Sequence, residues 1–144
     1  MQTEIPENVL KKLRAIEASG ADNYSVRVES DTANSIPIRG ITLTRKDGKG
    51  EPIKLYLTVR DGITTIRKQW AIPSAKFTKQ ELREKLTKKT EPPKTGFEVL
   101  DGDRGTHTAE IFGSVKITPA MKKKQAVDTL KKLLLQLAAI EIDL

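Results

Sequence analysis

Residues 53–70, IKLYLTVRDGITTIRKQW, constrain the fold more than any other stretch of the chain. Apolar and polar residues alternate on both sides of the Asp-Gly pair at 61–62. An Asp-Gly pair between two alternating runs favours a type I′ turn, because both central positions of that turn need positive φ. The sequence therefore predicts a two-residue β-hairpin in which Arg60 pairs with Ile63 and, in the same register, Ile53 pairs with Trp70.

The two faces of this predicted hairpin differ in character, because successive side chains of a strand point to opposite faces. The first face is mostly apolar and carries Ile53, Leu55, Leu57, Val59, Thr64, Ile66, Lys68 and Trp70. The second face is polar and carries Lys54, Tyr56, Thr58, Arg60, Ile63, Thr65, Arg67 and Gln69. We expect the first face to be core, with Lys68 as its one discordant member. A basic face with a tyrosine can lie against phosphates and bases, although a solvated outer face is the alternative.

Positive charge collects around the hairpin. The chain carries 26 Lys and Arg against 19 Asp and Glu, a net charge of +7. Residues 1–30 hold four cations against five carboxylates, residues 31–94 hold fifteen against seven, and residues 95–144 hold seven against seven. The whole excess therefore lies in the middle segment. Such clustering is expected of a surface that binds a polyanion.

Helices are predicted before, within and after this basic segment. Apolar residues recur at helical spacing in residues 6–19 and again in residues 118–140. Residues 75–89 contain the clearest helix start, because Thr78 and Glu81 have the spacing of a capping box. Four further strands are predicted over residues 23–29, 36–45, 97–100 and 107–117, and the Pro-Pro pair in residues 89–96 predicts a break between the two halves.

These elements predict an α+β fold with an antiparallel sheet of about six strands, made of a four-strand meander plus a hairpin, packed by three helices. One domain is expected over residues 1–144. Within it, residues 1–22 form the N-terminal helix, residues 23–89 the basic meander with its helix, and residues 97–144 the hairpin with the long last helix.

The last helix has more apolar residues than a one-sided surface helix needs. We expect it to be a central core element, and a homodimer interface through residues 126–140 is the alternative. The sequence has no apolar run long enough to span a bilayer, and its first residues have no apolar core of a signal peptide. A soluble cytoplasmic protein without a membrane partner is therefore expected.

The residue types present argue against most enzyme chemistries. The chain has no cysteine and one histidine, His107, so thiolate nucleophiles, cysteine-ligated metals and histidine clusters are excluded. The Asp-Gly-Asp at 101–103 does not have the spacing of an EF-hand loop. We expect a non-enzyme with no cofactor and no metal.

The sequence predicts a nucleic-acid-binding protein, with DNA favoured over RNA, that contacts the phosphate backbone through the basic sheet face as a DNA-binding regulator or accessory factor. The alternative is a small adaptor that docks on a larger complex through its last helix or an exposed sheet edge. The candidate nucleic-acid-binding residues are Arg45, Lys46, Lys49, Lys54, Tyr56, Arg60, Arg67, Lys76, Lys79 and Arg83.

Overall fold

The computed structural model describes residues 6–90, 95–102 and 104–141. One antiparallel sheet forms its framework, with strand order β1-β2-β3-β4-β6-β5. The strands are β1 (Tyr24–Asp31), β2 (Ile36–Arg45), β3 (Ile53–Arg60), β4 (Ile63–Pro73), β5 (Thr95–Asp101) and β6 (Thr106–Lys116). The predicted α+β class, with a four-strand meander plus a hairpin, is confirmed.

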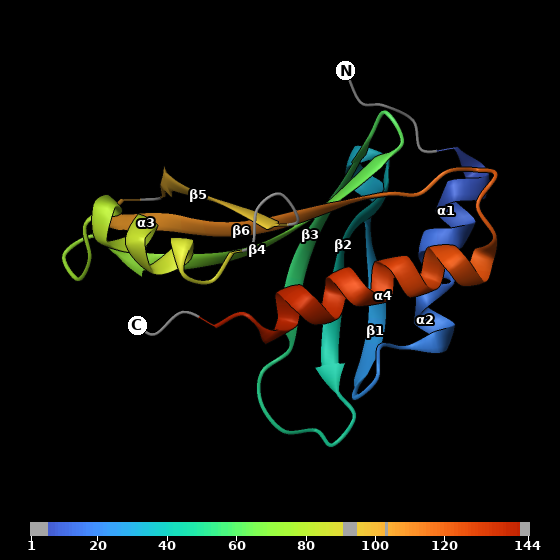
Figure 1. Cartoon of the computed structure of the whole chain (residues 1–144), viewed down its shortest axis with the longest axis horizontal. Coiled ribbons are helices and arrows are strands. Elements are labelled where there is room, and N and C mark those ends of the chain that lie inside the picture. The colour runs from blue at the N-terminus through green and yellow to red at the C-terminus, as the bar shows by residue number, and fades with distance from the viewer. Residues whose placement is uncertain (1–5, 91–94, 103, 142–144) are drawn as a thin grey trace.

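Helices pack on one side of this sheet (Figure 1). They are α1 (Glu7–Arg14), α2 (Ile16–Ser19), α3 (Lys79–Thr87) and α4 (Lys123–Ala139), with a short 3-10 turn η1 at Thr32–Asn34. In Figure 1, α4 crosses in front of β1 to β3 and also contacts β4 and β6, whereas α1 and α2 lie beside the edge strand β1 and α3 packs on β5 and β6. The helix predicted over residues 6–19 is divided at Ala15 into α1 and α2. The break predicted at Pro92-Pro93 and the residue Asp103 lie outside the described residues.

The predicted start of α3 is confirmed, and the predicted start of α4 is wrong. Thr78 accepts a hydrogen bond from the Glu81 backbone N–H and the Glu81 carboxylate accepts one from the Thr78 N–H, which completes the capping box. The last helix begins at Lys123 instead of residue 118. Residues 118–122 are used to turn the chain from the end of β6 toward α1, where the Pro119 carbonyl accepts a hydrogen bond from Lys12.

The Asp-Gly turn sets the hairpin register as predicted. Asp61 and Gly62 have φ values of 54° and 79°. The pairs run from Arg60 with Ile63 to Tyr56 with Arg67. The hairpin face predicted to be apolar does turn toward the helices and into the core.

The pairing predicted between Ile53 and Trp70 is wrong, because β3 and β4 part after Tyr56 and Arg67. Beyond that point β3 continues beside β2, and β4 continues beside β6 over its whole length, from Ile63 to Pro73. The two strands diverge visibly in Figure 1. β4 thus keeps a complete ladder with β6, whereas β3 exchanges β2 for β4 at Tyr56, and the sheet opens into a fork between β3 and β4.

The apolar stripe of α4 belongs to the core. Leu130, Leu134 and Leu137 have no exposed surface, and Leu133 and Ala138 are nearly as buried. The homodimer interface expected as an alternative through residues 126–140 is therefore not supported, because this chain already covers the side chains that would form it. Within the described residues, none of the helices is long and apolar enough to cross a membrane.

Candidate nucleic-acid interface

The face of the sheet turned away from the helices carries most of the polar hairpin face predicted from the sequence. Three strands lie side by side there, in the order β3, β4 and β6, so their registers assemble rows of side chains across the sheet. We call the nine residues of three such rows the open-face patch. They are Arg60, Ile63 and Lys116 in the first row, Thr58, Thr65 and Ser114 in the second, and Tyr56, Arg67 and Phe112 in the third.

The first row is basic and exposed. Arg60 pairs with Ile63, and Ile63 pairs in turn with Lys116. Ile63 is 45% exposed although it is a large apolar residue. Neither Arg60 nor Lys116 forms an ion pair with another residue that the structure describes. Both cations are therefore available to an anion in solution.

The second row consists of hydroxyl groups. The Thr65 Oγ1 and Ser114 Oγ atoms are 2.8 Å apart and share a hydrogen bond. The Thr58 hydroxyl accepts a hydrogen bond of 2.9 Å from Arg67 Nη1. Hydroxyl groups of this kind can donate to phosphate oxygens without adding charge.

The third row places Arg67 between two aromatic rings. Tyr56 is 40% exposed. Phe112 lies on the other side of Arg67 and close to Gly96, where an added Cβ would lie 2.8 Å from the ring. Gly96 thus leaves room for the Phe112 ring on the sheet. An exposed ring beside cations is a surface on which a base or a sugar can pack.

Arg67 differs from the other cations of the patch, because its charge is already paired. Its Nε atom lies 2.8 Å from Oε1 of Glu110, which is 4% exposed, and Gln69 donates to Oε2 of the same carboxylate at 3.1 Å. Glu110 was not among the candidate nucleic-acid-binding residues predicted from the sequence. Its place opposite Gln69 follows only from the pairing of β4 with β6, which joins segments about 40 residues apart.

The remaining candidate residues do not join this patch. Arg45 lies at the end of β2, at a position whose side chain faces the helices by the alternation of the strand. Its Nη2 atom lies 2.6 Å from Oδ2 of Asp47. The Lys49 backbone N–H and the Arg45 side chain both donate to Asp47 and hold the pKa of that carboxyl below its usual value. Lys46 and Lys49 are exposed in the loop between β2 and β3. Lys54 is exposed on the open face, two residues beyond the end of the β3–β4 ladder.

The three candidates near α3 lie at the far end of the sheet. Lys79 forms an ion pair with Asp101, and this contact lowers the pKa of the Asp101 carboxyl. Lys76 lies over the Phe77 ring, with its Nζ atom 5.9 Å from the ring centre. Arg83 is exposed on α3. These cations are separated from the open-face patch by the sheet, so they do not form one phosphate-binding track with it.

The fork between β3 and β4 explains the discordant Lys68. Its ammonium donates to the Leu137, Ala138 and Ile140 carbonyls at 3.2, 3.3 and 2.6 Å, and it lies 5.3 Å from the centre of the Trp70 ring. Burial lowers the pKa of Lys68, while the nearby Glu141 carboxylate opposes that shift. Lys68 therefore closes the C-terminal end of α4 and is not part of the open face.

Other kinds of site receive no support in the described part of the chain. No group of three or more histidine, aspartate or glutamate residues there could hold a metal ion. The fork between β3 and β4 is a hollow of about 530 Å³, bordered by Lys54, Tyr56, Gln69 and Trp70.

Comparison with known proteins identifies the fold but not the role. No protein-family model matches the chain, and no curated protein matches its sequence. The structure is similar to that of YbjN from E. coli, which is described as "a putative transcription regulator". The TM-score is 0.56 at 10% sequence identity, and the match covers 90% of this chain and 85% of that chain. A likeness at this identity establishes a shared fold and carries over no residue roles.

Proposed function

We propose that this chain is a non-enzymatic nucleic-acid-binding protein that holds the phosphate backbone on its open-face patch. The observation that carries the proposal is the first row, in which Arg60 and Lys116 flank an exposed Ile63 and have no ion-pair partner among the described residues. Cations of this kind bind phosphates, and the charge they neutralise releases counterions from the nucleic acid.

The neighbouring rows supply the other contacts of a nucleic-acid surface. The hydroxyl row lies next to the cations and can donate to phosphate oxygens, and Tyr56 presents an exposed ring for a base or a sugar. One exposed aromatic ring is too little for a long single-strand stacking platform. Backbone contacts to duplex DNA therefore fit the patch better than stacking along a single strand, and a regulator or accessory factor on DNA is the corresponding role.

The alternative function, a protein-binding adaptor, has one specific observation in its favour. Tyr56, Ile63 and Leu100 are the large apolar residues with the most exposed surface among the described residues, and strand parity places all three on the open face. Exposed apolar residues that share a face can mark a protein interface. An adaptor would use the same side of the sheet, but its binding would depend on these apolar side chains instead of the cations.

A charge reversal separates the two functions. In the variant Arg60→Glu/Lys116→Glu, we expect the affinity for a fluorescent DNA duplex, measured by anisotropy at about 50 mM salt, to fall at least tenfold. The matched control is Lys88→Glu/Lys89→Glu, which makes the same change of charge at two exposed lysines next to α3. Equal affinity of both variants, with unchanged melting temperatures, would refute the proposal.

A further inference from the structure

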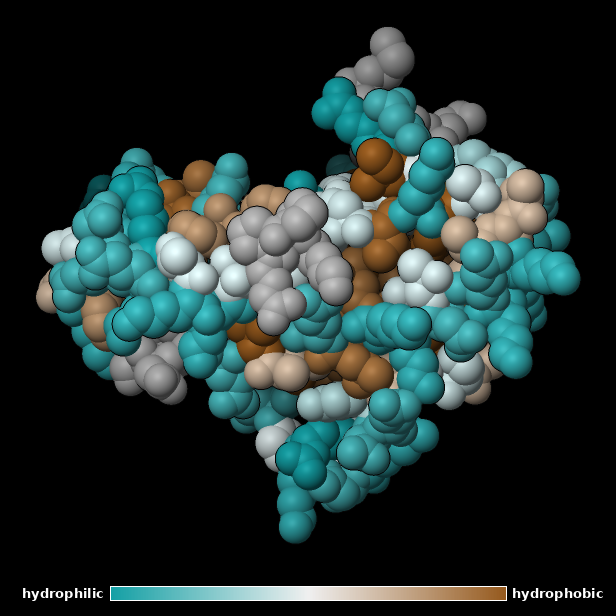
Figure 2. Space-filling view, viewed as in Figure 1, coloured by the Kyte–Doolittle hydropathy of each residue, from teal (hydrophilic) through white to brown (hydrophobic). Residues whose placement is uncertain are grey.

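A second basic surface lies on the helix side of the molecule. The net charges of residues 1–30 and 95–144, which form it, do not predict it. We call it the α1–α4 basic surface, and its cations are Lys11, Lys12, Arg14, Lys122, Lys123, Lys124 and Lys132. Hydrophilic side chains gather over α1 and α4 in Figure 2. The packing of α1 against α4 creates this surface, and a hydrogen bond of 2.9 Å from Lys12 Nζ to the Pro119 carbonyl joins α1 to the loop before α4.

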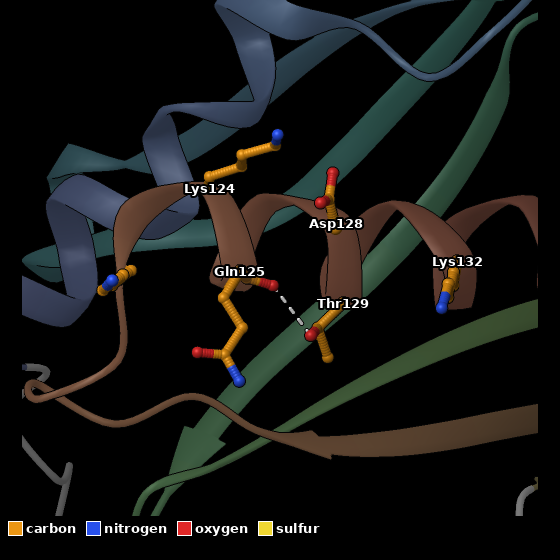
Figure 3. Close-up of a pocket in the computed structure, with 6 residues that line it drawn as sticks. Lys124, Gln125, Asp128, Thr129 and Lys132 are labelled. Carbon is orange, nitrogen blue, oxygen red and sulfur yellow. Dashed lines mark hydrogen bonds between the residues drawn. The ribbon is translucent and has the colours of Figure 1, made fainter.

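The surface contains two shallow hollows on either side of the start of α4. One hollow, of about 580 Å³, lies between α1 and the start of α4 with the loop before it. It is lined by Asn8, Lys11, Lys12, Arg14, Ala15, Met121 and Lys123. The other, of about 370 Å³, follows α4 itself and is shown in Figure 3. There Lys124 and Lys132 stand at the two ends of the hollow, with Asp128 and Thr129 between them.

In the described part of the chain, few carboxylates lie near the lysines of this surface. Glu7 lies 3.9 Å from Lys11, and Asp128 lines the second hollow. Asp22 does not reduce the charge of the surface, because it forms an ion pair of 2.8 Å with Lys131, which raises the pKa of that lysine. Among the described residues, the six lysines of the surface therefore face two carboxylates.

The kinds of side chain on this surface indicate what kind of partner it can bind. The large apolar side chains with the most exposure lie on the other face of the sheet. Interfaces between proteins depend on buried aromatic and apolar anchors and are depleted in lysine, and helices that bind lipid surfaces need an exposed apolar stripe. A lysine-rich surface without such anchors fits a phosphate backbone, which needs only charge.

The spacing of the lysines agrees with this partner. Lys124 and Lys132 are eight residues apart, which corresponds to about 12 Å along a helix. The major groove of B-DNA is about 12 Å wide, so the two ammonium groups can reach phosphates on its two walls. In addition, α4 begins without a side-chain cap at Lys122, so the backbone N–H groups of its first turn have no capping side chain.

We propose that the α1–α4 basic surface is a second site for nucleic-acid backbone, and that one molecule bridges two duplexes, one on each side of the sheet. The bridging rests on the proposed function, because the other duplex occupies the open-face patch. The sheet separates the two sites, so a single short duplex cannot contact both.

A capture experiment tests the bridging. Beads carrying an unlabelled duplex are incubated with the protein and then with a fluorescent duplex of a different sequence, at about 50 mM salt. Wild-type protein and the control Lys88→Glu/Lys89→Glu should retain the fluorescent duplex. The variant Lys124→Glu/Lys132→Glu should retain only the background level, while it still binds one duplex in the anisotropy assay with the salt slope expected of the open face alone.

Each other result has a definite meaning. Undiminished retention by Lys124→Glu/Lys132→Glu, for example through a protein dimer, would overturn the second site. If Arg60→Glu/Lys116→Glu binds duplex like wild type and Lys124→Glu/Lys132→Glu does not bind it, the second site stands and the proposed role of the open face falls. If the protein binds phosphatidylserine vesicles or polyglutamate but no duplex, both proposals are overturned in favour of another anionic partner.

Discussion

Lys68 offers the sharpest test of how the two halves of the sheet are held together. Its side chain enters the fork between β3 and β4 and donates three hydrogen bonds to carbonyls at the end of α4, at 3.2, 3.3 and 2.6 Å. The last four carbonyls of a helix have no partner within the helix, and a cation near them also interacts favourably with the helix dipole. The substitution Lys68→Met keeps most of the aliphatic stem and removes the ammonium group.

The expected loss follows from two opposing effects. Hydrogen bonds to a charged group contribute about 1.5–3 kcal/mol each when they are made singly, and three that share one ammonium contribute less than their sum. Burial of the ammonium, which lowers the pKa of Lys68, acts against them. We therefore expect Lys68→Met to lower the free energy of unfolding by about 2 kcal/mol, or the melting temperature by about 6 °C in a chain of this size.

Thermal and urea unfolding followed by circular dichroism would measure this difference. The control is Lys88→Met, which changes an exposed lysine and should alter the free energy of unfolding by less than about 0.5 kcal/mol. If Lys68→Met is as stable as wild type or more stable, the burial of the charge outweighs the three hydrogen bonds, and Lys68 does not hold the end of α4.

Three further predictions concern single groups. Glu110→Gln removes the carboxylate partner of Arg67 and should lower the free energy of unfolding, measured in urea, by about 1–2 kcal/mol. The same change makes the arginine available to phosphate, so duplex binding should become tighter and its salt slope steeper by about one. The capping hydrogen bonds with Thr78 lower the pKa of Glu81 below its usual 4.5, so its charge stabilises the fold above pH 4.5 and this contribution is lost as pH falls through the lowered pKa. The gap in melting temperature between wild type and Glu81→Gln should accordingly close between neutral pH and about pH 3, and a gap that stays constant would contradict this. Leu134→Asp places a carboxylate at a fully buried position and should leave a chain without helical circular dichroism, whereas a folded monomer would instead favour an interface through residues 126–140.

Local sequence signals predicted much of the fold, because each rests on neighbouring residues. The Asp-Gly turn at 61–62 determined the pairing of Arg60 with Ile63, and Thr78 and Glu81 marked the start of α3. Alternation along residues 53–70 likewise separated the buried face from the exposed one.

The fork could not be predicted in this way. Continuing the hairpin register would pair Ile53 with Trp70, but it takes no account of β6, which pairs with all of β4 and draws it away from β3. The cost of opening the sheet is reduced by Lys68, which appeared in the sequence only as a discordant residue.

The candidate site was predicted in part. Lys54, Tyr56, Arg60 and Arg67 do share the open face, but Arg67 is neutralised by Glu110 across a long-range strand pair. Lys116 joins Arg60 by the same pairing.

The net charge of each sequence segment did not predict the α1–α4 basic surface on the helix side of the sheet. Residues 1–30 and 95–144 have net charges of −1 and zero, which indicated no basic surface. The structure brings their lysines together on α1 and α4, while Glu110 and Asp101 pair with cations elsewhere. Net charge along a sequence cannot report this separation, because only folding determines which carboxylates meet which cations.

The salt dependence of duplex binding by the wild-type protein tests the central claim most directly. Lys54, Arg60 and Lys116 are the open-face cations without an ion pair among the described residues, so three phosphate contacts are expected from that face. Three contacts give a slope of log affinity against log salt of about −2.7, which is an affinity loss of about 40-fold between about 50 and 200 mM salt. Duplex binding that does not change with salt, or no binding at the lower salt, would contradict the claim that this protein holds a phosphate backbone.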